Sequence, residues 1–192
     1  MSGRLTIVGI SGSLSVPSRT ASLVGTFLER VAYGVDAHLI DLAADAPALF
    51  ATLPKGPRSE RAREIITAVE TADLLVVGSP VYRASYTGAL KHLFDLVDYR
   101  ALEGTPVLVC ATGGTPLHGL MPDHQFRPLF AFFKALVLPT SVYALESDFE
   151  GFALRSPDVR ARVERAALEA RRYLGLPASV PKSAPISLAA TA

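Results

Sequence analysis

The sequence contains no tryptophan, only one cysteine and almost no excess of charge of either sign. The single cysteine, Cys110, excludes an intrachain disulfide and is compatible with a reducing compartment. Lysines and arginines number 19 against 18 aspartates and glutamates, so the formal net charge is +1. This balance offers no broad electrostatic footprint for nucleic acid. We therefore expect no nucleic-acid partner.

Long uninterrupted apolar runs are also missing. Residues 129–145 form the most apolar stretch, but Lys134 and Pro139 interrupt it, whereas a membrane-spanning helix needs about 20 apolar residues. The N-terminal run, residues 5–10, is shorter than the apolar region of a usual signal peptide. We expect a cytoplasmic protein that does not associate with membranes.

What the sequence does contain is typical of a globular domain. Of its 192 residues 49% are apolar and 19% are charged, which allows one sizeable core. We expect a single domain over residues 1–175. The small and proline-rich residues 176–192 predict a flexible C-terminal tail.

Apolar runs that are typical of strands alternate with segments of helical periodicity. The predicted strands lie in residues 4–11, 35–42, 73–80, 105–114 and 139–146. The predicted helices lie in residues 18–33, 59–72, the second half of 81–97, 123–138 and 156–175. Residues 43–58 are expected to form a loop, and Pro128 is expected to weaken or bend the fourth helix. Ser59 and Ser156 are predicted N-caps.

Alternating strands and helices predict an α/β protein with helices on both faces of a parallel sheet. For a chain of this length we expect a flavodoxin-like three-layer sandwich whose five strands follow the order 2-1-3-4-5. Ligands bind such sheets beyond the carboxyl ends of the strands. Three loops rich in Gly, Ser and Thr are expected to meet at that edge, namely residues 11–20, 79–88 and 111–119.

The first of these loops leads into a helix, whose free N–H groups and dipole favour an anion. Hydroxyl groups there can donate to phosphate oxygens, and one guanidinium adds charge: Ser11, Ser13, Ser18 and Thr20, with Arg19. No GxxxxGK[ST] or GxGxxG motif is present. The structural alternative is that these residues only cap the helix.

The other two loops suit a flat ligand. Tyr82, Arg83 and Tyr86 offer side chains against which a conjugated ring can lie, although Tyr82 and Tyr86 could equally be rim or interface aromatics. Gly113 and Gly114 let backbone approach a ligand closely. A tight turn explains the same two glycines equally well.

Taken together, segments 12–23, 79–96 and 111–136 resemble the NAD(P)H-dependent FMN reductases of the flavodoxin-like superfamily. The resemblance extends from about Leu5 to Leu174. It is greatest to the reductases that serve two-component alkanesulfonate and methanesulfonate monooxygenases. It implies an NAD(P)H:FMN oxidoreductase with FMN as its flavin and NADH or NADPH as electron donor.

The resemblance also implies roles for particular positions. The phosphate is expected at Ser13, Ser18, Arg19 and Thr20. The ribityl chain and isoalloxazine are expected along Pro80, Val81, Tyr82 and Arg83, and the ring edge at Thr112, Gly113 and Gly114. Ser11 and His118 complete the set of predicted flavin-binding residues.

Family members transfer a hydride from nicotinamide C4 to flavin N5, which requires stacking of two rings and no acid–base pair. Accordingly, no catalytic residue is assigned. Reduced FMN is expected to leave for a partner monooxygenase, and the chain to form a homodimer or tetramer. Two alternatives are a quinone or chromate-type reductase that retains FMN and a flavodoxin-type electron carrier. The pI of about 7.9 speaks against the carrier, which is typically acidic.

His124 is the one residue with a predicted role in flavin transfer. In the alkanesulfonate-linked reductases the matching position holds a Tyr in an inserted helical turn, and the methanesulfonate-linked relatives resemble this sequence in carrying His. We therefore predict a π-type bulge at His124, against the alternative of an ordinary exposed or interface histidine. His118, Asp123 and His124 form no established metal motif, so no metal is expected. Cys110 is interpreted as a structural core residue.

Overall fold

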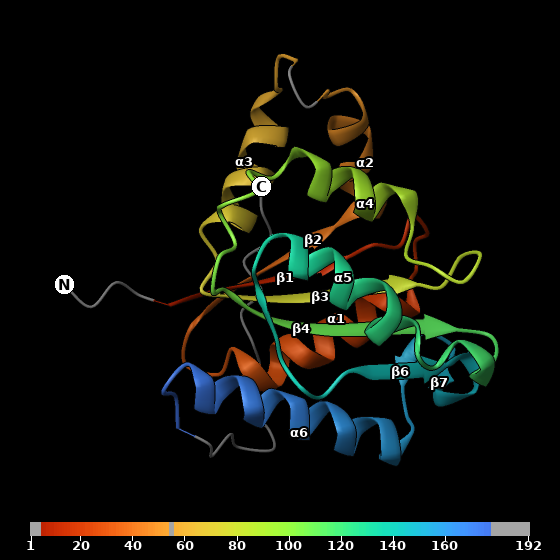
Figure 1. Ribbon diagram of the computed structural model, residues 1–192. Coiled ribbons are helices and arrows are strands. Elements are labelled where there is room, and N and C mark those ends of the chain that lie inside the picture. Colours follow the sequence, from red (N-terminus) through yellow and green to blue (C-terminus); the bar gives the residue numbers. More distant parts are fainter. Residues whose placement is uncertain (1–4, 54–55, 178–192) are drawn as a thin grey trace.

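The computed structural model describes residues 5–53 and 56–177 and shows a three-layer α/β sandwich (Figure 1). The main sheet is parallel and has the order β2-β1-β3-β4-β5, with β6 also paired to β4. Its strands are β1 (Thr6–Ser11), β2 (Asp36–Asp41), β3 (Leu74–Pro80), β4 (Pro106–Gly113), β5 (Leu136–Val137) and β6 (Val142–Leu145). The predicted fold class and strand order are confirmed.

Helices cover both faces of this sheet (Figure 1). One face carries α1 (Arg19–Val31) and α6 (Pro157–Tyr173); the other carries α2 (Leu42–Phe50), α3 (Glu60–Glu70), α4 (Gly88–Leu96) and α5 (Arg127–Phe132). In β3, Leu74 and Val76 pack toward α1 and α6, whereas Leu75 and Val77 pack toward the opposite helices. All four are fully buried, as expected of a strand covered on both sides.

Three predicted helix starts are confirmed, at Ser18, Ser59 and Ser156. The hydroxyls of Ser18, Ser59 and Ser156 each accept a hydrogen bond from the N–H three residues later, at 3.2, 3.1 and 3.4 Å. Pro157 occupies the first position of α6, where its missing N–H has no intrahelical partner in any case. Gly175, with φ of 68°, follows the end of that helix.

The expected loop at residues 43–58 is wrong over its first half, which forms α2. The prediction gave too much weight to Pro47, which lies inside this helix. Two contacts favour the helix. Asp41 caps the helix by accepting a hydrogen bond from the N–H of Ala43 at 3.3 Å. Arg61 of α3 forms a bidentate ion pair with Asp45 at 2.8 and 3.1 Å. Tertiary packing thus overrides the local proline signal.

The predicted helix at residues 123–138 is shorter than expected and irregular. A π-helical turn, η2 (Pro122–Phe126), precedes α5, and the backbone then turns at Lys134, with φ of 54°, into β5. Pro128 accounts for the irregularity, because it has no N–H to donate to the carbonyl four residues earlier. The π-type bulge predicted at His124 is confirmed.

The fifth strand position is occupied by two short segments rather than one. β5 pairs with the first two residues of β4, and β6 pairs with its last four. Residues 138–141 separate the two segments. Further on, β7 (Phe149–Glu150) and β8 (Ala153–Leu154) form a small antiparallel hairpin that the sequence pattern did not indicate.

Within the described ranges, no helix combines the length and the apolarity that crossing a bilayer requires. Most of the predicted tail, residues 178–192, lies outside the described residues. The two described residues of that tail, Leu176 and Pro177, form hydrogen bonds with the buried Arg171. The Leu176 N–H donates to the Arg171 carbonyl at 2.8 Å. Arg171 Nε donates to the Pro177 carbonyl at 2.7 Å.

Candidate functional site

The carboxyl ends of β1, β3, β4 and β6 surround a pocket of about 360 Å³. It is lined by Ser13, Ser15, Pro17, Ser18, Arg19, Thr20, Pro80, Val81, Tyr82, Thr112, Gly113, Gly114, Glu146 and Phe152. The structure therefore brings together most of the predicted flavin-binding residues from three loops that are distant in sequence. Ser11, Arg83 and His118 are not part of its lining.

The first loop contributes most of the polar side chains that line the pocket, at the start of α1. Ser18 caps the helix, as the structural alternative proposed, but it also lines the pocket. Ser13 accepts the N–H of Ser15 at 3.2 Å and so shapes the loop. Arg19, in the first turn, places a guanidinium beside these hydroxyls. Hydroxyls, one cation and a helix N-terminus together favour an anion.

Hydrogen bonds tie the three loops to one another. The hydroxyls of Thr20 and Thr112 lie 2.7 Å apart and join the first loop to the third. Thr87 donates its hydroxyl to the Gly12 carbonyl at 2.7 Å, and Val81 N–H donates to the Thr112 carbonyl at 2.8 Å. The pocket is thus preorganised before any ligand enters.

A strained turn forms the rim of the pocket after β3. Tyr82 and Ser85 exchange two backbone hydrogen bonds of 2.9 and 3.1 Å around Arg83 and Ala84, whose φ angles are 51° and 64°. Left-handed conformations cost about 1 kcal/mol or more in residues with a Cβ, and such strain concentrates at functional sites. The turn exposes 52% of Tyr82 at the pocket, where a ring can stack on it.

The two glycines of the third loop differ in the space that a Cβ would have at each position. A Cβ at Gly113 would lie 2.1 Å from the hydroxyl of Tyr143, which donates to the Thr115 carbonyl at 2.6 Å. Burial raises the pKa of Tyr143, although its hydrogen bond to that carbonyl acts in the opposite direction. A Cβ at Gly114 would meet nothing within 4 Å. Packing requires a glycine at 113, whereas 114 leaves an open side to the pocket.

Within residues 5–53 and 56–177, two buried side-chain polar atoms have no hydrogen-bond partner: the Ser11 hydroxyl and Arg19 Nε. Buried polar groups are nearly always bonded, so each exception needs an explanation. Ser11 does not line the pocket and is fully buried at the end of β1. Arg19 lines the pocket, and its side chain as a whole is 34% exposed although its Nε is buried, so part of the guanidinium is open to an anion. The residues present therefore fit a flavin phosphate.

The sequence prediction missed Glu146 and Phe152. Glu146 forms an ion pair with Arg19 Nη1 at 3.2 Å. The Arg19 guanidinium lies 5.4 Å from the centre of the Phe152 ring. A usable signal existed for Glu146, because it ends the predicted fifth strand and carboxyl ends of parallel strands share an edge. Phe152 lies in the unpredicted β7–β8 hairpin, for which no such signal was present.

His124 lies away from this pocket. It lines a second, larger cavity of about 910 Å³ along α4 and α5, together with aromatic side chains that include Tyr86, Tyr99 and Phe132. The same π turn contacts the strained rim, since Gln125 accepts a hydrogen bond from Ser85 at 3.1 Å. The role of His124 in flavin transfer stays a prediction.

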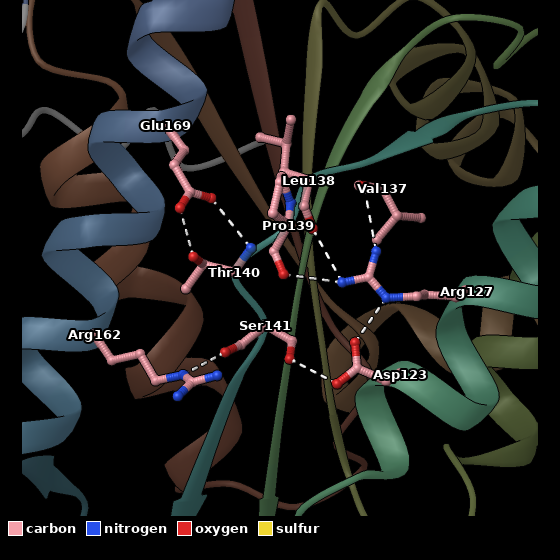
Figure 2. A network of polar contacts seen from close by, with 9 residues as sticks. All are labelled: Asp123, Arg127, Val137, Leu138, Pro139, Thr140, Ser141, Arg162 and Glu169. Atoms are coloured by element: carbon pink, nitrogen blue, oxygen red, sulfur yellow. Dashed lines mark hydrogen bonds and ion pairs between the residues drawn. The ribbon is translucent and has the colours of Figure 1, made fainter.

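A polar network holds the π turn to the rest of the sheet (Figure 2). The Asp123 carboxylate accepts hydrogen bonds from Arg127 Nε at 2.7 Å and from the Ser141 hydroxyl at 3.1 Å. Arg127 also donates to the carbonyls of Val137, Leu138 and Pro139 at 3.3, 3.3 and 3.0 Å. These carbonyls belong to the interruption between β5 and β6, or border it, so Arg127 compensates for missing strand pairing.

The same interruption is held from the other side by α6 (Figure 2). Glu169 accepts the N–H and the hydroxyl of Thr140 at 3.1 and 2.5 Å, and Arg162 donates to the Ser141 carbonyl at 2.7 Å. The network therefore connects the π turn, the interrupted strand and α6 in one continuous set of bonds.

Cys110 is fully buried in β4. Burial raises the pKa of its thiol far above the ordinary range, which makes it a poor nucleophile at neutral pH. Among the described residues, no group of three or more His, Cys, Asp or Glu side chains could hold a metal ion.

Curated relatives are similar over nearly the whole chain. An "FMN reductase (NADPH)" of Pseudomonas aeruginosa is 44% identical over 177 residues, which cover 91% of this chain and 95% of that protein. An "NADH-dependent FMN reductase SfnE" of Pseudomonas putida is 42% identical over 186 residues, or 96% of this chain and 100% of the relative.

Solved structures agree with these relatives. An oxidoreductase from Corynebacterium diphtheriae superposes with a TM-score of 0.80 at 34% identity and covers 89% of this chain and 97% of its own. The apo form of NADH:FMN oxidoreductase (EMOB) gives 0.75 at 32% identity, with 91% of each chain covered. The family model described as NADPH-dependent FMN reductase matches residues 5–150. The pocket and these likenesses lead to one conclusion: the chain belongs to the NADPH-dependent FMN reductase family.

Proposed function

We propose that this protein is the reductase of a two-component system, which reduces FMN with NADH or NADPH and releases it to a separate flavin-dependent monooxygenase. The observation that carries the proposal is the small pocket at the carboxyl edge, about 360 Å³, in a chain of this family. That volume is near the lower end for small-molecule sites, so a flavin there would stay partly exposed and could leave. Similar relatives are named for NADH and for NADPH, and the proposal therefore includes either donor.

The phosphate-binding role falls to Arg19, Ser18 and Thr20 in this proposal. Arg19 provides the charge, and the residues that carry the two hydroxyls line the same pocket. Arginine suits phosphate because its planar donors match the oxygens of the anion. Ser13 and Thr112 complete the polar part of the lining.

The ring-binding role falls to Pro80, Val81 and Tyr82 on one loop and Gly113 and Gly114 on the other. When bound, FMN accepts a hydride at N5 from nicotinamide C4. The chain's contribution is to hold the ring against the preorganised rim and leave its other side open to the nicotinamide. No acid–base residue is needed for that step.

Oxidation of NADH and NADPH by the isolated protein tests this function, with FMN, FAD and riboflavin compared as acceptors. We expect rapid oxidation that depends on added FMN and is weaker with riboflavin. Equal rates with riboflavin and FMN would contradict the phosphate role of the first loop. FMN that stays bound through purification, with double-displacement kinetics against quinones, would indicate the FMN-retaining quinone or chromate-type reductase instead. An absence of NAD(P)H oxidation would indicate an electron carrier.

A homodimer or tetramer formed through α4 and α5 is part of the proposal. Phe132 and Tyr99 expose 68% and 54% of their surfaces along the larger cavity, and exposed aromatic patches mark interaction sites. His124 lies on the same face, where it could influence flavin transfer. Light scattering should show a dimer or tetramer, and Phe132→Asp should shift it toward the monomer. A wild-type monomer would contradict this part.

Two further statements belong to the proposal. Residues 1–175 form one catalytic domain, supported by a core that extends from β1 to α6. The protein works in the cytoplasm, supported by a single free thiol buried at Cys110.

A further inference from the structure

We propose that Glu146 sets the affinity for FMN by competing with the flavin phosphate for Arg19. This inference rests on the proposed function, because it assumes that the phosphate binds in the pocket at the start of α1. It assigns a role to a residue that lies outside all three loops predicted from the sequence. The role is to weaken FMN binding, so that the flavin behaves as an exchangeable substrate.

The first observation is the ion pair itself. Arg19 Nη1 and Glu146 Oε1 are 3.2 Å apart, and both residues line the pocket. Glu146 begins η3 (Glu146–Asp148), directly after β6, so the sheet fixes its position relative to the first loop. The ion pair therefore lies inside the site where the phosphate is expected.

The second observation is that Arg19 is held in place by contacts that do not use its donors fully. Its guanidinium lies 5.4 Å from the centre of the Phe152 ring, a distance at which a cation is attracted to an aromatic face. Its Nε is buried without a partner. The side chain is positioned by Phe152 and is partly neutralised by Glu146.

The third observation is the charge of the pocket. Arg19 and Glu146 are the charged side chains among the described residues that line it, so the lining has no net charge. A phosphate monoester carries about −1.5 to −2 at pH 7. Glu146 both occupies a donor of Arg19 and repels that dianion.

The side chain of Glu146 is 64% exposed, so solvent screens its charge and its effect is moderate rather than absolute. A moderate effect is what an exchangeable flavin requires, because FMN must bind from solution and also leave. Removing the charge while keeping the size of the side chain isolates this effect.

The test is direct binding, measured by quenching of flavin fluorescence without any nicotinamide. We expect Glu146→Gln to lower the Kd of FMN about threefold to tenfold. The Kd of riboflavin, which has no phosphate, should stay the same. An unchanged or higher Kd of FMN, or an equal change for riboflavin, would overturn the inference.

Glu150→Gln is the matched control. Glu150 forms an ion pair of the same length, 3.2 Å, with Arg155 on the neighbouring hairpin and does not line the pocket. This variant should leave both Kd values unchanged, and a tighter FMN complex with it would indicate a general effect of net charge and overturn the specific role of Glu146.

The two levels of failure are distinguishable. If the wild-type protein shows no saturable quenching of FMN, the proposed function fails. If the wild type binds FMN and the Glu146 variant binds it equally, only this inference fails. Circular dichroism of each variant establishes that the protein measured is folded.

Discussion

Two polar regions lie at the two ends of β6, and they differ in how far their hydrogen bonds are satisfied. Before the strand, Asp123, Arg127, Ser141 and Glu169 form several hydrogen bonds, some with other side chains and some with backbone groups (Figure 2). After the strand, Arg19 lies in the pocket with a buried Nε that has no partner.

The difference distinguishes a structural polar region from a binding one. A partly buried network whose members are bonded contributes to a unique fold. An unpartnered buried donor costs free energy, so the region that contains Arg19 is not optimised for stability alone. Both regions contain an Arg–carboxylate pair, so the presence of an ion pair does not separate them. Their unused donors do.

The largest effect should come from breaking the network. Arg127→Ala removes one carboxylate and three carbonyl contacts, and we expect the free energy of unfolding to fall by about 3 kcal/mol, on the basis of about 1 kcal/mol for each bond less solvent compensation. Urea denaturation measures it. Arg162→Ala, which loses a single carbonyl contact, should cost about 1 kcal/mol. FMN affinity that fell as much as stability in these variants would contradict the separation of the two regions.

Removing the Arg19 guanidinium should weaken FMN binding strongly and affect stability little, the reverse of the effect expected for Arg127. Arg19→Met keeps the length of the side chain, and we expect the Kd of FMN to rise about 30-fold, which corresponds to about 2 kcal/mol. The free energy of unfolding should not fall by more than about 0.5 kcal/mol, because the ion pair with Glu146 is solvent-exposed and the variant also removes the unpartnered buried Nε. Fluorescence titration and urea denaturation give the two quantities. A rise in the riboflavin Kd of the same size would show that Arg19 does not act through the phosphate.

High pH offers a third test, because Cys110 in β4 lies between the helical layers. Burial raises the pKa of its thiol in the folded protein, whereas the unfolded chain has a thiol pKa of about 8.5. Below that pH both states keep the proton and the thiol has no effect on the pH dependence. Above it only the unfolded state loses the proton, so stability falls as pH rises. We expect the wild type to lose about 1.2 kcal/mol more than Cys110→Ala between pH 9 and 10, measured by urea denaturation. Equal slopes would indicate that the thiol ionises in the folded state.

The smallest effect sharpens the comparison at one helix start. Ser18→Ala and Ser59→Ala each remove a cap with nearly the same geometry, and each should lower the free energy of unfolding by about 1 kcal/mol. Only Ser18 lines the pocket, so only Ser18→Ala should raise the Kd of FMN, by about threefold. If the two variants bind FMN alike, Ser18 is a cap and nothing more.

The parts of the fold that the sequence predicted are those whose signals are local. The buried run of β3 and the serine caps at 18, 59 and 156 depend on neighbouring residues alone. The helix at residues 42–50 was missed because its stabilising partner, Arg61, lies on the next helix. The interruption of the fifth strand depends on Arg127, which reaches across from α5.

The candidate site was predicted as far as topology carries. Carboxyl ends of parallel strands share an edge, and this brought Ser13, Tyr82 and Thr112 to one pocket. Glu146 obeys the same rule and was overlooked, whereas Phe152 arrives on a hairpin whose packing no local pattern revealed. The sequence contains no established phosphate-binding or dinucleotide-binding motif. The identity of the ligand as a flavin was therefore inferred from the resemblance to a family.

The interruption of the fifth strand also bears on solubility during folding and storage. This strand position forms one border of the sheet, and an unprotected border can template pairing with a strand of another molecule. Here the border is split into segments of two and four residues, Pro139 lacks a donor, and side chains already occupy backbone groups between the segments. The bonds that fix the π turn thus also occupy backbone groups at this border that a strand of a neighbouring molecule would need for pairing.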